Sequence, residues 1–189
     1  KAKGYAAGLE MKLHGEFVPG AESWLSVSLM RTEEDILDDY IYIENREPGY
    51  YPRPMDQRLN IGLFFQDYFP NRPDYKVHLN VLYGTGLPFS PPDNERYDLV
   101  FRMPSYKRVD IGLSKSLKRE DQVFGEKNPL NFFNDIWLNA EIFNLLGINN
   151  TISYLWVKTV FNQENMPGEF GVPNYLTSRR YNIRITARF

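Results

Sequence analysis

The last ten residues, Arg180-Tyr-Asn-Ile-Arg-Ile-Thr-Ala-Arg-Phe189, alternate between apolar and polar side chains without a break. Successive side chains of a β-strand point to opposite faces, so this segment predicts a strand with one apolar and one polar face. The apolar face would carry Tyr181, Ile183, Ile185, Ala187 and Phe189. A strand of about ten residues with an aromatic residue at each end of its apolar face is typical of a transmembrane β-barrel, with lipid outside and a wet lumen inside.

The same alternation recurs along the chain and predicts an all-β fold, an antiparallel transmembrane β-barrel segment of nine strands. The segment 97–103 alternates weakly, and 152–161 is included because it is rich in β-forming residues. The predicted strands are 9–17, 25–30, 58–66, 77–84, 97–103, 108–117, 135–143, 152–161 and 180–189.

The predicted connections differ in length, and the difference indicates orientation. Barrels of this kind have short turns in the periplasm and long loops outside. The short connections are 18–22, 70–74, 104–106 and 145–151, and the long ones are 31–54, 85–95, 119–133 and 162–178. The two kinds alternate strictly, which predicts a periplasmic C-terminus and a first strand that starts outside.

The number of predicted strands indicates whether residues 1–189 form a whole barrel or part of one. A single-chain bacterial barrel normally has an even number of strands with both ends in the periplasm. Nine strands that start outside therefore predict that residues 1–189 are one domain, the C-terminal part of a larger barrel. If 97–103 were not a strand, eight strands would remain and a small autonomous barrel would be possible, although long loops would then lie on both sides.

Composition excludes several classes of protein. Mean hydropathy is -0.48, and no apolar run reaches the length of a transmembrane helix, so a helical membrane protein is excluded. A barrel is compatible with this value because half of each strand is polar. A net charge of -2 indicates neither nucleic acid nor an anionic membrane surface as a partner. Without cysteine there is no disulfide framework and no thiolate metal site.

Three segments carry a resemblance to a known family. They are Pro104-Ser-Tyr-Lys-Arg-Val-Asp-Ile-Gly-Leu-Ser114, Leu138-Asn-Ala-Glu-Ile-Phe-Asn-Leu-Leu-Gly147, and Arg180 to the terminal Phe189. In this order and spacing, residues 55–189 resemble the C-terminal barrel of TonB-dependent outer-membrane receptors. Residues 1–30 are compatible with that barrel but less distinctive.

The resemblance implies a function and partners. It implies the last part of a 22-stranded barrel in the bacterial outer membrane, closed by a plug domain that these residues do not contain. Such a receptor imports a scarce small nutrient (a siderophore, cobalamin, glycan or peptide) with energy from the TonB complex, which it contacts through its N-terminal part. Phe189, with Tyr181 and Ile185, resembles the aromatic signal that the barrel-assembly machinery recognises.

The polar sides of the predicted strands form a charged wall facing the lumen. Arginine binds carboxylates and phosphates through both oxygens, so this wall would contact either an anionic substrate or the plug. The alternative is a lattice of internal salt bridges, which we favour because an unpaired row of arginines would repel itself. The residues are Arg180, Arg184, Arg188, Arg108, Asp110, Asn139 and Glu141, with Arg102, Lys12 and Asp135 as further members.

The first long loop is aromatic and acidic. Tyr40, Tyr42, Tyr50 and Tyr51 are candidate extracellular ligand contacts, because aromatic faces suit sugars and flat chelates alike. The acidic residues lack the spacing of a calcium loop, so we interpret them as a solvated surface rather than a cation site. They are Glu33, Glu34, Asp35, Asp38 and Asp39.

No enzyme activity is predicted. His14 and His78 fall on strands that are not neighbours, and no nucleophile with a nearby base and no phosphate-binding glycine loop is present, so neither metal nor cofactor is expected. Asn149-Asn-Thr151 matches a glycosylation pattern but falls in a predicted periplasmic turn. Two alternatives remain open: a barrel that acts as an adhesin or anchor without transport, and a soluble β-sandwich or lipocalin-like binder in which Tyr181, Ile183 and Ile185 would face a protein core.

Overall fold

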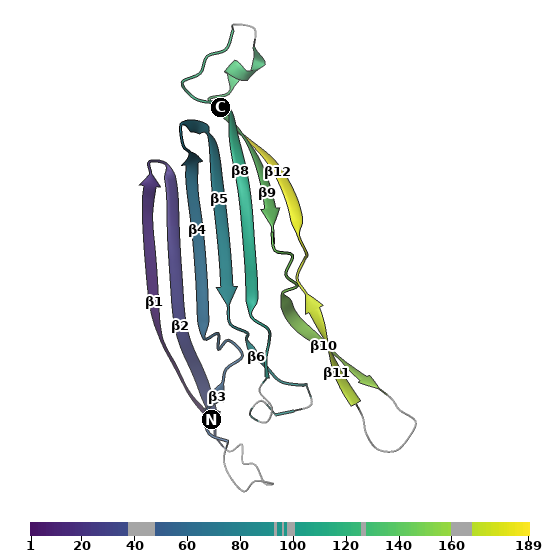
Figure 1. Ribbon diagram of the computed structural model, residues 1–189. Helices are drawn as coiled ribbons and strands as arrows, with labels where there is room; N and C mark the ends of the chain where they lie inside the picture. Colours follow the sequence, from purple (N-terminus) through teal and green to yellow (C-terminus); the bar gives the residue numbers. More distant parts are fainter. Residues whose placement is uncertain (38–47, 93, 96, 98–100, 126–127, 160–167) are drawn as a thin grey trace.

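The computed structural model describes residues 1–37, 48–92, 94–95, 97, 101–125, 128–159 and 168–189. It is all-β, and one long curved sheet dominates it (Figure 1). None of the described segments forms a helix long and apolar enough to cross a membrane.

Seven long strands form the main sheet, each antiparallel to the next. In sheet order they are β1 (Ala2–Val18), β2 (Ala21–Ile36), β4 (Leu59–Phe69), β5 (Arg72–Gly84), β8 (Tyr106–Lys118), β9 (Asp135–Phe143) and β12 (Arg180–Arg188). The short strand β3 (Tyr51–Pro52) pairs with β2. Among the described residues no ladder joins β1 to β12, so the sheet is open with these two strands at its edges.

In the described part of the chain, two small sheets and one helical turn lie outside the main sheet. The strands β6 (Pro88–Phe89) and β7 (Phe101–Arg102) form one pair. The strands β10 (Thr151–Thr159) and β11 (Gly168–Tyr175) form a hairpin. A single 3₁₀ turn, η1 (Pro129–Phe132), lies in the connection from β8 to β9.

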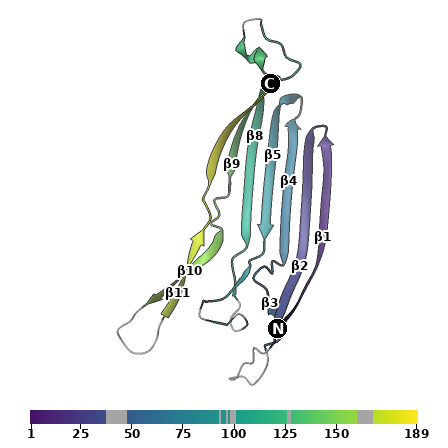
Figure 2. The ribbon, with the colours of Figure 1, turned by 180° about the vertical axis from the view of Figure 1, so that it is seen from behind.

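The two ends of the sheet differ. At one end, which we call the short-turn end, two-residue turns join β1 to β2 and β4 to β5. Gly20 and Asn71 adopt positive φ in these turns (79° and 58°), as tight hairpins require. The C-terminus and the 119–134 connection lie at the same end (Figure 1). The N-terminus and the strands β3, β6, β10 and β11 lie at the opposite end, which we call the long-loop end (Figures 1 and 2).

The predicted number of nine crossing strands is not confirmed. Seven of the predicted strands lie in the main sheet, but of 97–103 only Phe101–Arg102 is a described strand, and it pairs with β6. The segment 152–161 pairs with β11 instead of crossing, because its own hairpin supplies the hydrogen bonds. Residues 98–100 and 160–161 lie outside the described part.

The predicted alternation of short and long connections is wrong as a consequence. Without a crossing at 97–103, the long 119–134 connection lies at the short-turn end beside the two-residue turns. The 145–151 connection, with Asn149, lies at the long-loop end rather than in a short periplasmic turn. Because the predicted strand 97–103 does not cross the sheet, the connections 119–133 and 145–151 that follow it lie at the opposite end of the sheet from the predicted one.

Burial on the central strand β8 is the inverse of that in a soluble protein. On β8, Ser114 of the polar face is 7% exposed, whereas the neighbouring Leu113 of the apolar face is 43% exposed. On the edge strand β12 both faces are exposed: Ile183 is 75% exposed, and Arg184 and Arg188 of the polar face are exposed as well. The buried hydrophobic residues of the described part are Ala21, Tyr51 and Ile136. On β8 the packed side of the sheet is therefore its polar face.

The turn at Asn71 gives a first test of this fold. Replacing Asn71 by Val should destabilise the protein by about 1–2 kcal/mol, because a β-branched residue strains at positive φ. Asn71→Gly is the control and should unfold at or above the wild-type denaturant concentration, measured by urea titration with circular dichroism. Equal midpoints for the two variants would contradict this turn conformation.

Candidate functional site

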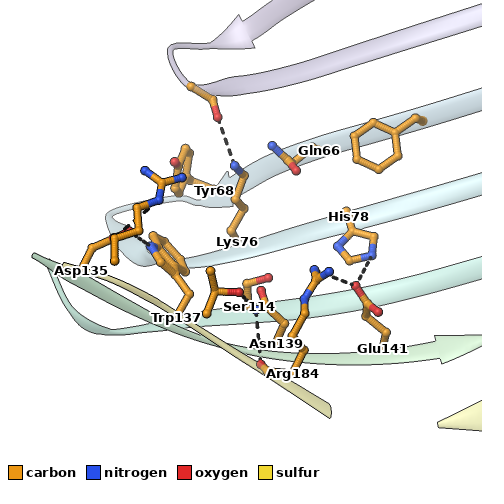
Figure 3. A pocket seen from close by; sticks show the side chains of 14 residues that line it. Gln66, Tyr68, Lys76, His78, Ser114, Asp135, Trp137, Asn139, Glu141 and Arg184 are labelled. Atoms are coloured by element: carbon orange, nitrogen blue, oxygen red, sulfur yellow. Dashed lines mark hydrogen bonds and ion pairs between the residues drawn. The ribbon is translucent and has the colours of Figure 1, made fainter. Parts of the chain in front are cut away.

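A hollow of about 550 Å³ lies on the polar face near the short-turn end. Its lining comes mainly from β4, β5, β9 and β12, and it combines aromatic rings with amides and charges of both signs (Figure 3). The lining residues are Gly20, Phe64, Gln66, Tyr68, Lys76, His78, Ser114, Asp135, Trp137, Asn139, Glu141, Arg184, Thr186 and Arg188.

Glu141 is the centre of the polar contacts in this hollow. Its carboxylate accepts a hydrogen bond from Asn182 Nδ2 at 2.9 Å and lies 3.5 Å from Arg184 and 3.7 Å from His78 Nε2. Figure 3 shows His78 and Arg184 directed at it from two sides. Because β9 pairs with β12, the Glu141 side chain contacts both Asn182 and Arg184 on the neighbouring strand.

His78 reaches Glu141 only because Gly112 stands between them. His78 on β5 pairs with Gly112 on β8, and Gly112 pairs with Glu141 on β9. A Cβ atom at position 112 would overlap the His78 ring. On its other side the ring stacks on Phe64 at 6.0 Å between centroids, and Phe64 stacks on Trp24 at 6.2 Å. A row of rings therefore crosses three strands and ends at a carboxylate.

The predicted wall residues are paired with one another. Arg184 lies 3.5 Å from Glu141, and Arg188 lies 3.7 Å from Asp135. Asn139 donates to the Arg184 carbonyl oxygen at 3.3 Å. These contacts have the form of the salt-bridge lattice that we favoured. Lys12 lies on β1, away from this cluster, and His14 on the same strand lies 3.7 Å from Glu22.

A second polar centre joins β8 to the end of β9. Asp110 accepts hydrogen bonds from Arg108 Nε at 2.7 Å and from the backbone N–H of Asn144 at 2.8 Å. Asn144 has positive φ (52°), and its side chain pairs with the backbone of Ile148. Arg180 lines a small hollow beside these residues. Two of the segments that resemble the receptor family thus meet at one buried carboxylate.

The long-loop end is organised by Asp56, whose side chain is fully buried. Its carboxylate accepts hydrogen bonds from Thr32 N at 2.8 Å, from Arg58 Nε at 2.7 Å and from Arg102. Arg102 also donates to the carbonyl oxygens of Asp56 and Gly86, so the β6–β7 segment is tied to the main sheet. Burial raises the pKa of Asp56, but the hydrogen bonds from Thr32 and Arg102 and the charges of Arg58 and Arg102 outweigh it, leaving the pKa below its usual value.

The acidic residues at the start of the first long loop are paired with arginines. Glu33 lies 2.7 Å from Arg31 and accepts a hydrogen bond from the Tyr5 hydroxyl at 2.5 Å. Glu34 lies 3.3 Å from Arg53. The solvated surface that we predicted is therefore wrong for Glu33 and Glu34, because both side chains are largely buried beside arginines from the strand and from the loop. Asp38 and Asp39 lie outside the described residues.

The predicted ligand tyrosines do not form one exposed surface in the described part. Tyr40 and Tyr42 lie outside it. Tyr50 packs edge-on against Tyr5 at 5.6 Å, and Tyr51 is buried with its ring 6.1 Å from that of Tyr97.

A different aromatic cluster lies at this end. Phe89 stacks on Tyr154 at 4.7 Å and lies 5.8 Å from Phe101 and 6.4 Å from Trp156. It joins β6, β7 and β10, and the alternation pattern does not predict it because β10 is far from β6 and β7 in the chain. The only sequence signal was the pair Tyr154 and Trp156 on one face of β10.

Among the described residues, no group of three or more His, Asp or Glu side chains is arranged to hold a metal ion. No family model, no curated protein and no solved structure matches the chain.

Asp56 gives a test of the long-loop end. Asp56→Asn should destabilise the protein by about 1.5–3 kcal/mol at pH 7, because hydrogen bonds to a charged group are lost. The pKa of Asp56 is lower in the folded protein, so its stabilisation is fully present above the unfolded pKa of about 3.9 and is lost as the pH falls through the folded value. The difference from wild type should thus persist from pH 7 to pH 5 and shrink below about pH 4.

The matched control is Asp121→Asn, which removes an exposed carboxylate 3.6 Å from Arg119. It should change the unfolding free energy by less than about 1 kcal/mol. Urea titrations at several pH values measure both variants, and an equal effect of the two substitutions would contradict the role given to Asp56.

Gly112 tests the row of rings. Gly112→Val should displace the His78 ring, break its contact with Glu141 and destabilise the protein by about 1–3 kcal/mol. Gly15→Val is the control, because no atom lies within 4 Å of a Cβ at that strand position. The histidine NMR signal of His78 should shift in the first variant only; an unshifted signal would show that the ring does not rest on Gly112.

Proposed function

We propose that this chain forms part of the wall of an outer-membrane β-barrel of the TonB-dependent receptor class, which imports a scarce nutrient. The observation that carries the proposal is the exposed apolar face of the main sheet. Leucine and isoleucine side chains of β1, β8 and β12 are exposed on this face, while on β8 the polar side chains of the opposite face are buried. In water an apolar face of this extent would be costly, whereas in a bilayer it is the face that meets lipid.

Strand length supports the same proposal. The nine residues of β12 span about 30 Å at 3.3 Å per residue, enough for a tilted strand to cross the hydrocarbon region. On β2 the apolar face ends at Leu29, beyond which Arg31 and Glu33 follow on the same face toward the long-loop end. A belt of apolar residues with charged residues beyond it is the pattern expected of a membrane-crossing wall.

The free edges indicate how the wall would be completed. With seven strands in antiparallel order, β1 and β12 run in the same direction. Joining them directly would create a parallel pair, whereas membrane barrels of this kind are antiparallel. We therefore propose that further strands, odd in number, close the barrel between these edges.

The polar face supports passage of a small solute. Its hollow combines an aromatic row with paired charges and amides, so a polar ligand finds both stacking surfaces and hydrogen-bond partners. The contact between Asp110 and Asn144 also gives a structural role to two segments on which the family resemblance rests. Plug, TonB complex and barrel-assembly machinery remain proposed partners on the basis of that resemblance.

Substitution on the two faces of β12 tests the membrane location. Ile183→Arg should destabilise the protein in phosphatidylcholine vesicles by about 2–4 kcal/mol, because an arginine would face the bilayer midplane. Thr186→Arg, on the polar face of the same strand, is the matched control and should destabilise the protein less than Ile183→Arg. Urea unfolding followed by tryptophan fluorescence measures both; equal effects, or a fold that is stable in buffer without detergent, would favour the soluble binder instead.

Growth of the producing bacterium tests the import step. A deletion strain should lose growth when one nutrient class (iron chelate, cobalamin, glycan or peptide) is limiting, and the restored gene should recover it. If the protein is found in the outer membrane but the deletion strain grows normally on all four nutrient classes, import would be contradicted. The adhesin or anchor would then be favoured.

A further inference from the structure

A second, smaller hollow lies on the polar face, where β8, β9 and β12 reach the long-loop end. Its volume is about 110 Å³, compared with about 550 Å³ for the hollow around Glu141. Pockets that enclose a whole ligand usually measure about 300–1,000 Å³, so this hollow has room for one functional group of a larger molecule. Arg108 and Arg180 both line it, and we call it the arginine hollow.

The two arginines approach one aromatic ring from strands on either side of it. Phe143 belongs to β9, which lies between β8 and β12. The Arg108 guanidinium group lies over the Phe143 ring, 5.3 Å from its centroid. Arg180 is directly opposite Phe143 in the β9–β12 ladder, so the two side chains leave the sheet on the same face. The arginine hollow therefore carries positive charge from two strands.

The two arginines differ in their partners. Arg108 Nε donates to Asp110 at 2.7 Å, so a carboxylate balances its charge. The exposed side chain of Arg180 forms no hydrogen bond or ion pair with the part of the chain that the structure describes. Arg184 and Arg188, on the same face of β12, both lie near carboxylates. Within the described residues, Arg180 is therefore the member of this row whose charge is not balanced.

Hydroxyl groups lie beside Arg180 on an ordered segment. Thr177 and Ser178 line the arginine hollow just before β12 begins. Leu176 N donates to the Asn150 carbonyl oxygen at 2.8 Å, which holds one end of the segment. At its other end, the Arg179 side chain donates to a carbonyl oxygen of the β9–β10 connection at 2.7 Å. The segment thus presents two hydroxyl donors and a guanidinium group to the same small space.

We infer that the arginine hollow binds an oxyanion group, a carboxylate or a phosphate, of the imported solute. A guanidinium group can donate to two oxygens of such a group at once, and neighbouring hydroxyl groups can donate to the same oxygens. A neutral group would leave the charge of Arg180 unbalanced, and a cation would be repelled by both arginines. The inference rests on the proposed function only for the origin of the group, because the chemistry of binding is the same for any anion of this kind.

Urea unfolding of the full-length protein in detergent measures the binding. A ligand that binds only the folded state raises the unfolding midpoint as its concentration rises. Sodium phosphate and sodium acetate are the two probes, and each replaces sodium chloride at constant ionic strength. Phosphate stands for a phosphate ester and acetate for a carboxylate, so the probe that stabilises the wild type identifies the group.

Three variants show whether the arginine hollow is the site. Arg180→Gln should raise the apparent Kd of the stabilising anion about tenfold or more, because hydrogen bonds to a charged group are lost. Arg180→Lys keeps the charge but not the fork, so its Kd should lie between the two, and it replaces the first variant if that one fails to fold. Arg72→Gln is the control, because it removes an exposed arginine at the short-turn end and should leave the Kd unchanged. Equal stabilisation of the wild type and Arg180→Gln by both anions would overturn the site.

Growth on the limiting nutrient separates this inference from the proposed function. The deletion strain receives the wild-type gene or the Arg180→Gln gene, with equal amounts of protein in the outer membrane. A requirement for about tenfold more nutrient in the Arg180→Gln strain would support binding of the imported solute. Equal growth of the two strains would overturn this assignment and leave import intact. If the wild-type gene itself restored no growth, the proposed function would be contradicted, while anion binding by the purified protein would stand.

Discussion

The period of two along each strand is the constraint on which this structure depends. Because successive side chains leave the backbone on opposite sides, each long strand sorts its residues into an apolar and a polar row, and the ladders align these rows across seven strands. A shift of one residue in any ladder would place charged side chains among the leucines. The register shifts are instead confined to strand ends, as between Ser116 and Lys118 or between Glu16 and Val18.

The polar face carries the packing that an ordinary sheet places on its apolar face. Charged and amide side chains there bond to each other across the ladders, so that burial leaves few of them without a partner. Glu141 and Asp110 each collect contacts from several strands or loops, and a carboxylate suits this role because it accepts several hydrogen bonds at once. At Gly112 the absence of a side chain leaves room for the ring of His78 on the neighbouring strand.

The connections at the two ends of the sheet are held in different ways. At the short-turn end, two-residue turns return the chain at once, and the one long connection is held by asparagine side chains and by Lys118. At the long-loop end, segments far apart in sequence are joined through the buried Asp56 and through the rings around Phe89. The buried carboxylate and the aromatic cluster thus hold segments of which β6, β7 and β10 have no ladder to the main sheet.

The sequence by itself determined the strands and their faces, since alternation is a local property that each segment displays alone. It therefore predicted β1, β2, β4, β5, β8, β9 and β12, and it placed Arg184 and Glu141 on one face. It did not determine which strands join the main sheet, because β7 and β10 satisfy their hydrogen bonds with β6 and β11, and such choices depend on partners far along the chain. The pairing of Glu33 with Arg58, the contacts of Asp56 with Thr32 and Arg102 and the cluster around Phe89 were likewise decided only by the tertiary structure, because each forms from residues that are far apart in the chain.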